Sequence, residues 1–229
     1  MKSIGVAIFV KTPGHSPLKT RLAKTIGERK SLEFYEESYR AVSDIVAEFA
    51  SLESRVRIQP YFAVAEKDCL KDVRWQKFPT VAQGEGDLGN RLSAVSDFLL
   101  SQHNGVIFLG SDSPQITVDT LEQAITSLIS RSFVIGPARD GGFYLFGSYG
   151  VKRLGFWNDI TYSSSSTLRE LRECIANIGG KPLDLETMDD VDVEADLAKI
   201  YAVLQRRHSP NQTHIFRWLS SFFQNRPLS

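Results

Sequence analysis

Short runs of apolar residues alternate with segments of helical periodicity along most of the chain. The apolar runs that predict strands are residues 4–10, 56–64, 78–83, 106–109, 133–136, 143–146 and 182–185. Helical spacing predicts helices over residues 31–52, about 88–100, 165–178 and 194–205, and one more that follows a cap at Thr117 or Asp119. This alternation is typical of the α/β class, so we expect a single three-layer domain with a mostly parallel central sheet between helices.

We expect this domain to occupy residues 1–207 and to be followed by a C-terminal amphipathic tail, residues 208–229. At 229 residues the chain is near the upper size for one hydrophobic core. The tail places Ile215, Trp218, Leu219 and Phe222 on one side of a short helix. We interpret this helix as one docked on the domain, in preference to a contact with a partner or a membrane.

Composition narrows the classes of function. Lysine and arginine together number 27, as do aspartate and glutamate, so the net charge predicts no nucleic-acid or membrane partner. The apolar run at residues 4–10 is far shorter than the roughly 18 residues that span a bilayer. Only Cys69 and Cys174 are present, without a Cys-x-x-Cys pair. We therefore expect neither a disulfide framework nor structural zinc, and a reducing, cytoplasmic setting.

The charges are unevenly distributed along the chain. The basic cluster is Lys11, Lys19, Arg21, Lys24, Arg29 and Lys30, and the acidic cluster is Asp184, Glu186, Asp189, Asp190, Asp192, Glu194 and Asp196. Two interpretations stay open: both clusters are solvated faces, or a phosphate-binding surface faces a metal-binding edge.

Ligands of open α/β sheets bind beyond the carboxyl ends of the strands, which directs attention to the loops at residues 11–21, 110–114 and 140–142. In the first loop, Lys19 and Arg21 beside a helix N-terminus can hold phosphates, although they can also be exposed surface cations. The loop is not a P-loop. Leu18 stands where the second glycine is needed, and Lys19 follows Gly14 by five residues instead of six.

Asp112 directly follows a continuously apolar strand, where a carboxylate is costly to bury unless it is paired or binds a metal. Carboxylate oxygen is the ligand that Mg²⁺ or Mn²⁺ prefers, and Pro114 stiffens the loop that presents it. The alternative is a turn or N-cap aspartate. Asp192 can supply a second metal carboxylate if its strand lies next to that of Asp112, or it can be a cap.

Two glycine motifs each allow two interpretations. Asp140-Gly141-Gly142 can be a hairpin turn, or its glycines can let a substrate approach the backbone while Asp140 accepts a hydroxyl hydrogen bond or acts as a base. Residues 84–89 match G-x-G-x-x-G, which indicates an oxidoreductase that binds a dinucleotide of the NAD type. Asp87 beside a pyrophosphate and Pro79 in the preceding strand weigh against that second interpretation.

Taken together, these residues resemble the DUF2064 family of transferases, which has the nucleotide-diphospho-sugar transferase (GT-A) fold and is related to phospholactate guanylyltransferases and molybdopterin-guanine transferases. The resemblance covers about residues 4–205. It rests on Lys-Thr-Arg-Leu at 19–22, Gln83-Gly84 with Asp87-Leu88-Gly89 and Arg91, Gly-Ser-Asp-Ser-Pro at 110–114, Gly136-Pro137 with Asp140-Gly141-Gly142, and residues 192–197. The sequence departs from the family pattern at Phe143, where tyrosine is common, and at Tyr162, where tryptophan is common.

The resemblance implies that Lys19 and Arg21 contact nucleotide phosphates and that Asp112 binds a metal. It also implies that the glycine motif at residues 84–89 is a nucleotide or acceptor loop. By analogy with related nucleotidyltransferases, Asp192 becomes the second metal ligand. The expected catalytic residues are Asp140, Lys19 and Arg21. The expected nucleotide-binding residues are Lys11, Lys19, Arg21, Gly84, Asp87, Arg91, Gly141 and Gly142.

These expectations lead to an enzyme that uses Mg²⁺ or Mn²⁺ and binds a nucleotide sugar or an NTP together with an unknown small-molecule acceptor. The leading hypothesis is a glycosyltransferase with a nucleotide-sugar donor. The rival hypothesis is a nucleotidyltransferase, in which an acceptor phosphate attacks an NTP and pyrophosphate leaves. The dinucleotide-binding oxidoreductase and a catalytically silent nucleotide-binding module are lesser alternatives.

Overall fold

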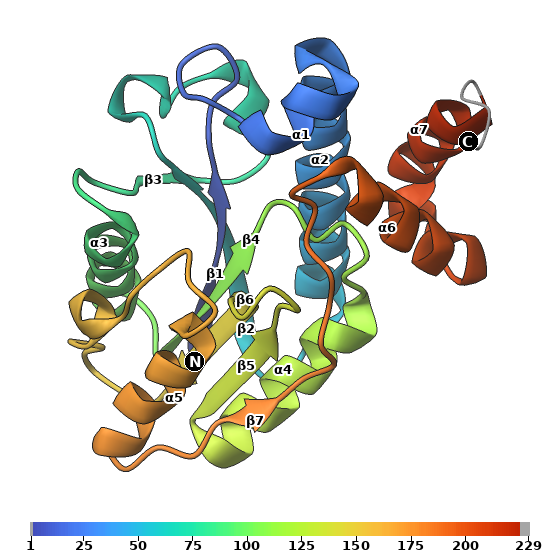
Figure 1. Ribbon diagram of the computed structural model, residues 1–229. Helices are drawn as coiled ribbons and strands as arrows, with labels where there is room; N and C mark the ends of the chain where they lie inside the picture. The colour runs from blue at the N-terminus through green and yellow to red at the C-terminus, as the bar shows by residue number, and fades with distance from the viewer. Residues whose placement is uncertain (1, 225–229) are drawn as a thin grey trace.

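The computed structural model describes residues 2–224, which form an α/β fold around one central sheet (Figure 1). The strands are β1 (Ser3–Val10), β2 (Arg57–Val64), β3 (Thr80–Ala82), β4 (Gly105–Gly110), β5 (Phe133–Pro137), β6 (Phe143–Tyr149) and β7 (Leu183–Asp184). Their order in the sheet is β3-β2-β1-β4-β6-β5-β7. Only β6 runs antiparallel to its neighbours, β4 and β5. The mostly parallel α/β sheet that the sequence predicts is therefore confirmed.

Helices cover both faces of this sheet. They are α1 (Thr20–Ile26), α2 (Glu28–Leu52), α3 (Leu88–Leu100), α4 (Val118–Arg131), α5 (Thr167–Asn177), α6 (Glu194–Arg206) and α7 (Thr213–Gln224). Short 3-10 turns lie at η1 (Lys67–Cys69), η2 (Val73–Trp75), η3 (Trp157–Asp159) and η4 (Pro210–Gln212). None of the helices in residues 2–224 is long and apolar enough to cross a membrane.

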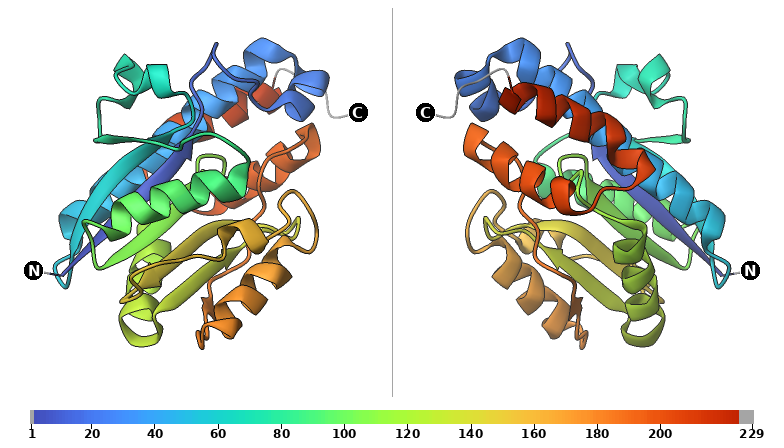
Figure 2. Two further views of the ribbon diagram at one scale, coloured as in Figure 1. Left: turned by 90° about the vertical axis from the view of Figure 1, so that its left-hand side faces the viewer. Right: turned by 90° about the vertical axis from the view of Figure 1, so that its right-hand side faces the viewer.

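The alternation of side chains along the strands builds two separate cores. Ile4, Val6 and Ile8 of β1 belong to a cluster with α2 and α4, whereas Ala7 belongs to a cluster with α3 and α5. The two views of Figure 2 show the sheet between these helix layers. The three-layer arrangement that the pattern predicts is what the structure shows.

The end of the chain adds a further layer outside α2. Ile215, Leu219 and Phe222 of α7 are buried in a cluster with residues of α1, α2 and α6, and Trp218 is half-buried beside them. The docked helix expected for the tail is therefore present. Met1 of the predicted domain and residues 225–229 of the predicted tail lie outside the described residues.

The structure differs from the predicted elements mainly near the site. A separate helix α1, which the sequence analysis did not predict, precedes α2, and Gly27 joins them in a left-handed conformation (φ 85°) that most side chains would strain. The helix predicted from residue 165 begins at Thr167, and the strand predicted over residues 182–185 has only two residues. The differences between pattern and structure are therefore confined to short segments and to the ends of elements.

Candidate functional site

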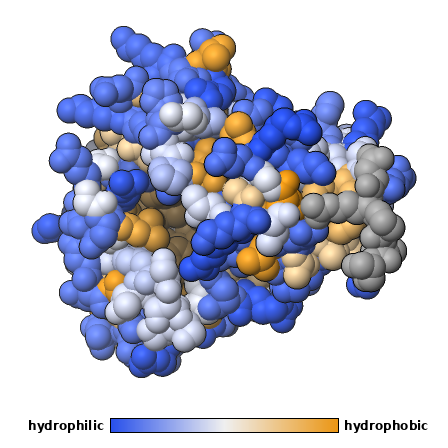
Figure 3. Space-filling view, turned by 45° about the horizontal axis from the view of Figure 1, so that its top comes forward, coloured by the Kyte–Doolittle hydropathy of each residue, from blue (hydrophilic) through white to orange (hydrophobic). Residues whose placement is uncertain are grey.

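Two adjoining cavities lie at the carboxyl ends of β1 and β4. The first cavity, of about 890 Å³, is bordered by the loop after β1, the start of α3 and the end of β4. The second cavity, of about 370 Å³, extends from the end of β4 toward the β5–β6 turn and the loop before α5. Both share Asp112, Asp140 and Asp192 on their walls. The two cavities therefore form one cleft, and Figure 3 shows a hollow with hydrophobic walls between hydrophilic rims on this side of the molecule.

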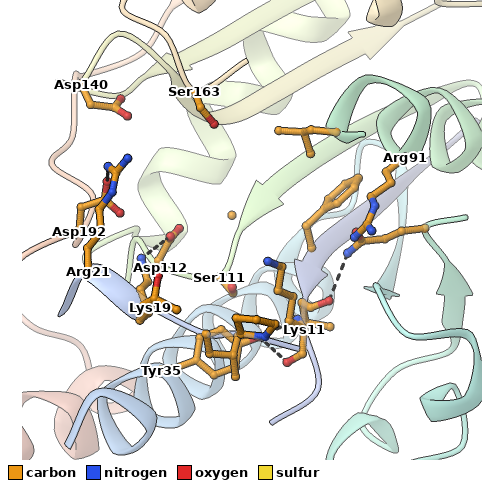
Figure 4. A pocket seen from close by; sticks show the side chains of 18 of the residues that line it. Lys11, Lys19, Arg21, Tyr35, Arg91, Ser111, Asp112, Asp140, Ser163 and Asp192 are labelled. Carbon is orange, nitrogen blue, oxygen red and sulfur yellow. Dashed lines mark hydrogen bonds and ion pairs between the residues drawn. The ribbon is translucent and has the colours of Figure 1, made fainter. Parts of the chain in front are cut away.

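Asp112 lies where the two cavities meet, and Lys19 is its partner. The Lys19 ammonium donates to Asp112 Oδ2 at 2.6 Å (Figure 4). It also donates to the Val191 carbonyl at 2.5 Å. Burial raises the pKa of the Asp112 carboxyl, but the Lys19 charge and hydrogen bond outweigh burial and hold that pKa below its ordinary value. Gly110 makes room for this carboxylate, because a Cβ there would lie 2.9 Å from Asp112 Oδ1.

Arg21 and Asp192 form a second ion pair at the rim of the first cavity. Arg21 Nη1 lies 2.9 Å from Asp192 Oδ2, and both side chains are well exposed. The metal role predicted for Asp192 depends on a strand next to that of Asp112, and this condition is not met. Asp192 lies in the loop before α6, and β7 is separated from β4 by β6 and β5. The loop nevertheless brings Asp192 to the same cleft as Asp112.

Lys11 and Arg91 line the first cavity on the side away from Asp140 and Asp192 (Figure 4). Arg91 donates from Nε to the carbonyl of Gly86 at 3.1 Å. Gln83 is 4% exposed and lines the same cavity; its Nε2 donates to the backbone carbonyls of β1 and β2. This glutamine is not among the predicted site residues, although it stands in the family motif.

Three polar side chains of α2 anchor the loops of the cleft. The Tyr35 hydroxyl donates to the Lys11 carbonyl and accepts from the Lys11 N–H, both at 2.8 Å. Ser31 Oγ donates to the Lys19 carbonyl at 3.2 Å, and Ser38 Oγ donates to the Ser111 carbonyl at 2.7 Å. Residues 31, 35 and 38 share one face of the helix because of its 3.6-residue period. One helix thus fixes the backbone of Lys11, Lys19 and Ser111.

The Asp140-Gly141-Gly142 motif is the hairpin turn that one of its two interpretations predicted, and part of it also borders the cleft. It connects the antiparallel strands β5 and β6, and Asp140 Oδ1 accepts the N–H of Gly142 at 2.9 Å. Asp140 also lines both cavities, and Gly142 lines the second. Gly141 does not line either cavity; it has φ +95°, and a Cβ there would meet the Ser165 backbone at 2.8 Å. The Gly141 position is therefore explained by its contact with the loop before α5.

Gly84 and Asp87 do not line the cleft either. Asp87 is the N-cap of α3 and accepts the Asn90 N–H at 3.0 Å. Gly89 is needed for packing, since a Cβ there would lie 2.7 Å from the Trp157 carbonyl. The strand before this motif, β3, has three residues and lies at the edge of the sheet. In dinucleotide-binding proteins the glycine motif instead follows the first strand of the sheet's βαβ units, at the point where the strand order reverses. The position of residues 84–89 after an edge strand therefore argues against the oxidoreductase.

The second cavity has a different composition. The described residues that line it include the four carboxylates Asp112, Asp140, Asp190 and Asp192, and no lysine, arginine or histidine. Its aromatic residues are Phe9, Phe108, Phe143, Tyr144 and Tyr162. The two departures from the family pattern, Phe143 and Tyr162, are therefore both on its walls.

Asp190 is a site residue that the sequence analysis did not select. Burial, followed by the charges of Asp140, Asp112 and Asp192, raises its pKa from 3.8 to about 6. Its neighbours in the acidic cluster mostly form surface ion pairs, for example Asp184 with Arg172 and Asp196 with Lys199. All members of the cluster are acidic in sequence, so the sequence alone does not distinguish them. The fold shows that Asp190 and Asp192 line the cleft and that the other members do not.

Comparison with known proteins shows the same fold. No curated protein matches the chain. It is similar to a "putative nucleotide-diphospho-sugar transferase" from Desulfovibrio desulfuricans G20, at 22% identity over 95% of this chain and 99% of the other, with a TM-score of 0.74. It is also similar to 4-diphosphocytidyl-2C-methyl-D-erythritol synthase from Anaerococcus prevotii DSM 20548 (12% identity, 90% and 99% covered, TM-score 0.58). A cytidylyltransferase from Leptospira borgpetersenii serovar Hardjo-bovis (strain JB197) gives 11% identity, 100% coverage of both chains and a TM-score of 0.54.

These likenesses establish a nucleotide-diphospho-sugar transferase-like fold. The family model described as "Uncharacterized protein conserved in bacteria (DUF2064)" matches residues 46–164, more than half of the chain. The protein therefore belongs to the DUF2064 family.

Proposed function

We propose that this protein is a metal-dependent glycosyltransferase that moves a sugar from a nucleotide-sugar donor to an acceptor hydroxyl. The observation that carries the proposal is the division of charge along the cleft. The cations Lys11, Lys19, Arg21 and Arg91 all line the first cavity, where they outnumber the three carboxylates that it shares with the second cavity. The described lining of the second cavity holds carboxylates and no cation. An anionic diphosphate fits the first cavity, and an acceptor without phosphate fits the second.

The first cavity suits the donor. Its volume of about 890 Å³ lies in the range of cofactor-sized pockets, and its cations can neutralise a diphosphate. Lys19 is 9% exposed and held between Asp112 and Val191, so its ammonium is already positioned on the cleft wall. When a diphosphate binds, Lys19 can replace its ion pair with Asp112 by one with a phosphate oxygen. Arg21 can replace its ion pair with Asp192 in the same way.

The residues present suit a divalent cation that shares its ligands with the donor. Among residues 2–224 no group of three or more histidine, cysteine, aspartate or glutamate side chains could hold a metal. Mg²⁺ commonly binds through one or two carboxylates and substrate phosphates, and the carboxylates of Asp112 and Asp192 both border the first cavity. Asp112 and Asp192 would hold the metal, which when bound supplies positive charge to the leaving diphosphate.

The transfer step needs a base beside the acceptor, and Asp140 suits that role. The acceptor oxygen would form a bond to C1 of the donor sugar while the bond from C1 to the diphosphate oxygen breaks. The nucleoside diphosphate leaves with the electron pair of that bond, and the hydroxyl proton passes to the Asp140 carboxylate. Asp140 lines both cavities, which suits a residue that acts between donor and acceptor.

Nucleotidyl transfer is the second candidate, because two structural neighbours carry synthase or cytidylyltransferase names. In that reaction the acceptor phosphate would lie among Asp140, Asp190 and the other carboxylates of the second cavity. Two unit charges about 4 Å apart interact by about 1–4 kcal/mol near a protein surface. Several such repulsions would oppose an anionic acceptor, so glycosyl transfer is favoured.

A turnover assay separates the two reactions. The protein is incubated with a panel of nucleotide sugars and of NTPs, with Mg²⁺ or Mn²⁺, and both released sugar and released pyrophosphate are measured. The proposal predicts metal-dependent release or transfer of the sugar from one nucleotide sugar, and no pyrophosphate from NTPs. Pyrophosphate release without sugar transfer would overturn it in favour of nucleotidyl transfer.

A further inference from the structure

The second cavity contains negative charge that the protein itself does not neutralise. Asp112 and Asp192 are paired with Lys19 and Arg21. Asp140 and Asp190 have no ion pair within the described part of the chain; the recorded hydrogen bond of the Asp140 side chain is the one from Gly142. Unpaired carboxylates in a partly buried site favour a ligand that brings positive charge or donor groups.

Aromatic rings form much of the remaining wall. Phe108 and Tyr144 are 3% and 4% exposed, so their rings are fixed by packing. Phe9 contacts Phe108 edge to face at 5.4 Å between ring centroids, and Phe143 and Tyr162 complete the apolar part of the lining. Aromatic faces combined with carboxylates are the combination that attracts organic cations, because the ring quadrupole and the carboxylate charge act in the same direction.

A buried hydroxyl in the same lining also has no partner. Ser113 directly follows Asp112, is 3% exposed and lines the second cavity. Its Oγ has no hydrogen-bond partner among the described residues. Buried hydroxyl groups are nearly always hydrogen-bonded, but this oxygen is enclosed behind the cavity wall and offers no exposed group to a ligand, so recognition depends on the carboxylates and the aromatic rings.

From these observations we infer that the acceptor is a hydroxyl compound that carries a positively charged amino group on an apolar or aromatic body, and that it bears no phosphate or carboxylate. This inference rests on the proposed glycosyltransferase function, because it names the acceptor class of that reaction. The amino group would lie against Asp190 and the aromatic rings, while the hydroxyl lies toward Asp140. A volume of about 370 Å³ suits a single ring with a short side chain.

Three probes of nearly equal shape test the charge preference directly. Tyramine, tyrosol and 4-hydroxyphenylacetate share a phenol ring and differ in a terminal ammonium, hydroxyl or carboxylate. Each is titrated into the full chain at neutral pH, and binding is followed by ligand-observed NMR. We expect tyramine to bind at least about tenfold more tightly than tyrosol, and 4-hydroxyphenylacetate to show no saturable binding. Equal or tighter binding of tyrosol or of the carboxylate would overturn the inference, as would no saturation by tyramine up to about 10 mM.

Asp190→Asn locates the preference within the cavity, and Asp184→Asn is its matched control. Asp184 belongs to the same acidic cluster, but it pairs with Arg172 and does not line the cleft. We expect Asp190→Asn to weaken tyramine binding at least about threefold and to leave tyrosol binding unchanged. Asp184→Asn should change neither. An unchanged ratio of tyramine to tyrosol affinity in Asp190→Asn would contradict the assignment.

A parallel titration with nucleoside diphosphates and Mg²⁺ keeps the two proposals distinguishable. Diphosphate binding together with loss of the tyramine preference would reject the acceptor class and leave the donor site standing. A tyramine preference without any diphosphate binding would reject the proposed glycosyltransferase, and with it the acceptor role of the second cavity.

Discussion

Individual backbone conformations mark the walls of the cleft. Lys19 and Ser163 have φ values of 43° and 55°, a left-handed conformation that is uncommon for residues other than glycine. Both line the first cavity, and they come from different loops. Such conformations persist where the surroundings impose them, and they are frequent at functional sites. At Lys19 the surroundings include the Ser31 hydroxyl, which binds its carbonyl.

Gly141 and Gly150 both have positive φ, so comparing them measures what the contact between position 141 and the Ser165 backbone contributes to stability. Gly141→Ala and Gly150→Ala both place a side chain at positive φ, but only at position 141 does a Cβ meet backbone, that of Ser165 at 2.8 Å. Gly150→Ala should cost about 1 kcal/mol of unfolding free energy, and Gly141→Ala about 2–4 kcal/mol. Urea unfolding measures both. Equal losses would show that the turn does not depend on its contact with the loop before α5.

His103 gives the fold a pH dependence remote from the cleft. Its ring lies between Ser3 Oγ at 2.9 Å and the Tyr61 hydroxyl at 3.0 Å, and burial, followed by the charge of Arg57, lowers its pKa. A lowered pKa means that the unfolded chain binds the proton more tightly. Stability should therefore fall as the pH drops through about 6.5, and should stop falling below the folded pKa. In His103→Gln, thermal unfolding should lose less stability between pH 8 and pH 5 than in the wild type. An identical pH dependence in both proteins would contradict this.

At the scale of single residues, sequence reasoning located Asp112, Lys19, Arg21, Asp192 and Asp140, and the fold brings all five to one cleft. It could not identify Asp190. The importance of this residue depends on the wall that it faces and on its having no ion pair among the described residues, and local sequence shows neither property. Asp87, by contrast, has the ordinary cap role that its position before a helix allows.

Among the elements, α2 contributes most to the geometry of the site. The hydroxyls of Ser31, Tyr35 and Ser38 each bond the backbone of a different cleft residue. A helix is well suited to this task because its own backbone is fully hydrogen-bonded and its side chains repeat at fixed spacing. The loops can then be irregular while the positions of Lys11, Lys19 and Ser111 stay fixed.

Tyr35→Phe tests this anchoring, and Tyr39→Phe is the control one turn later on the same helix. Tyr35→Phe leaves the N–H and carbonyl of Lys11 without the hydroxyl that binds both, so we expect a loss of about 1–3 kcal/mol in unfolding free energy. Nucleoside diphosphate affinity should fall several-fold in Tyr35→Phe and stay unchanged in Tyr39→Phe, since within residues 2–224 the Tyr39 hydroxyl interacts with Arg40 of the same helix and not with a loop of the cleft. Equal affinities in the two variants would reject the anchoring role.

The elements that sequence reasoning missed are short and depend on distant contacts. Helix α1 has seven residues, too few for a clear period, and residues 65–79 form two 3-10 turns instead of a regular element. The latter segment binds the loop after β1: Glu66 accepts the Thr12 N–H at 2.7 Å, and Trp75 donates to the Thr12 hydroxyl at 3.1 Å. Long helices and the apolar strand β4 were predictable because their pattern extends over many residues.

At the scale of the whole molecule, two features decide where the site lies. They are the antiparallel strand β6 and the segment of residues 185–192, which leads from β7 at the edge of the sheet back to the cleft. The sequence predicts the α/β class from its alternation, but strand order follows from packing between distant segments. β6 between β4 and β5 places the Asp140 turn beside the end of β4. The loop before α6 then returns from the edge of the sheet and brings Asp190 and Asp192 to the cleft.

The packing of α7 predicts that this helix unfolds together with the domain. Leu219 is fully buried in the cluster with α1, α2 and α6. Leu219→Ala should lower the unfolding free energy by about 2–5 kcal/mol in a single transition. Leu52→Ala, at a side chain that is 61% exposed, should change it by less than about 0.5 kcal/mol. A separate early transition in Leu219→Ala would show that α7 is an independent appendage.

The central claim is that the cleft binds a nucleoside diphosphate through a divalent cation at Asp112. Isothermal titration of a nucleoside diphosphate panel, with and without Mg²⁺, into the wild type, Asp112→Asn and Asp184→Asn tests it most directly. We predict that at least one diphosphate binds the wild type and Asp184→Asn equally, that binding requires Mg²⁺, and that Asp112→Asn weakens it at least about tenfold, or about 1.4 kcal/mol. Metal-independent binding of equal strength in all three proteins, or no binding of any diphosphate, would contradict the account.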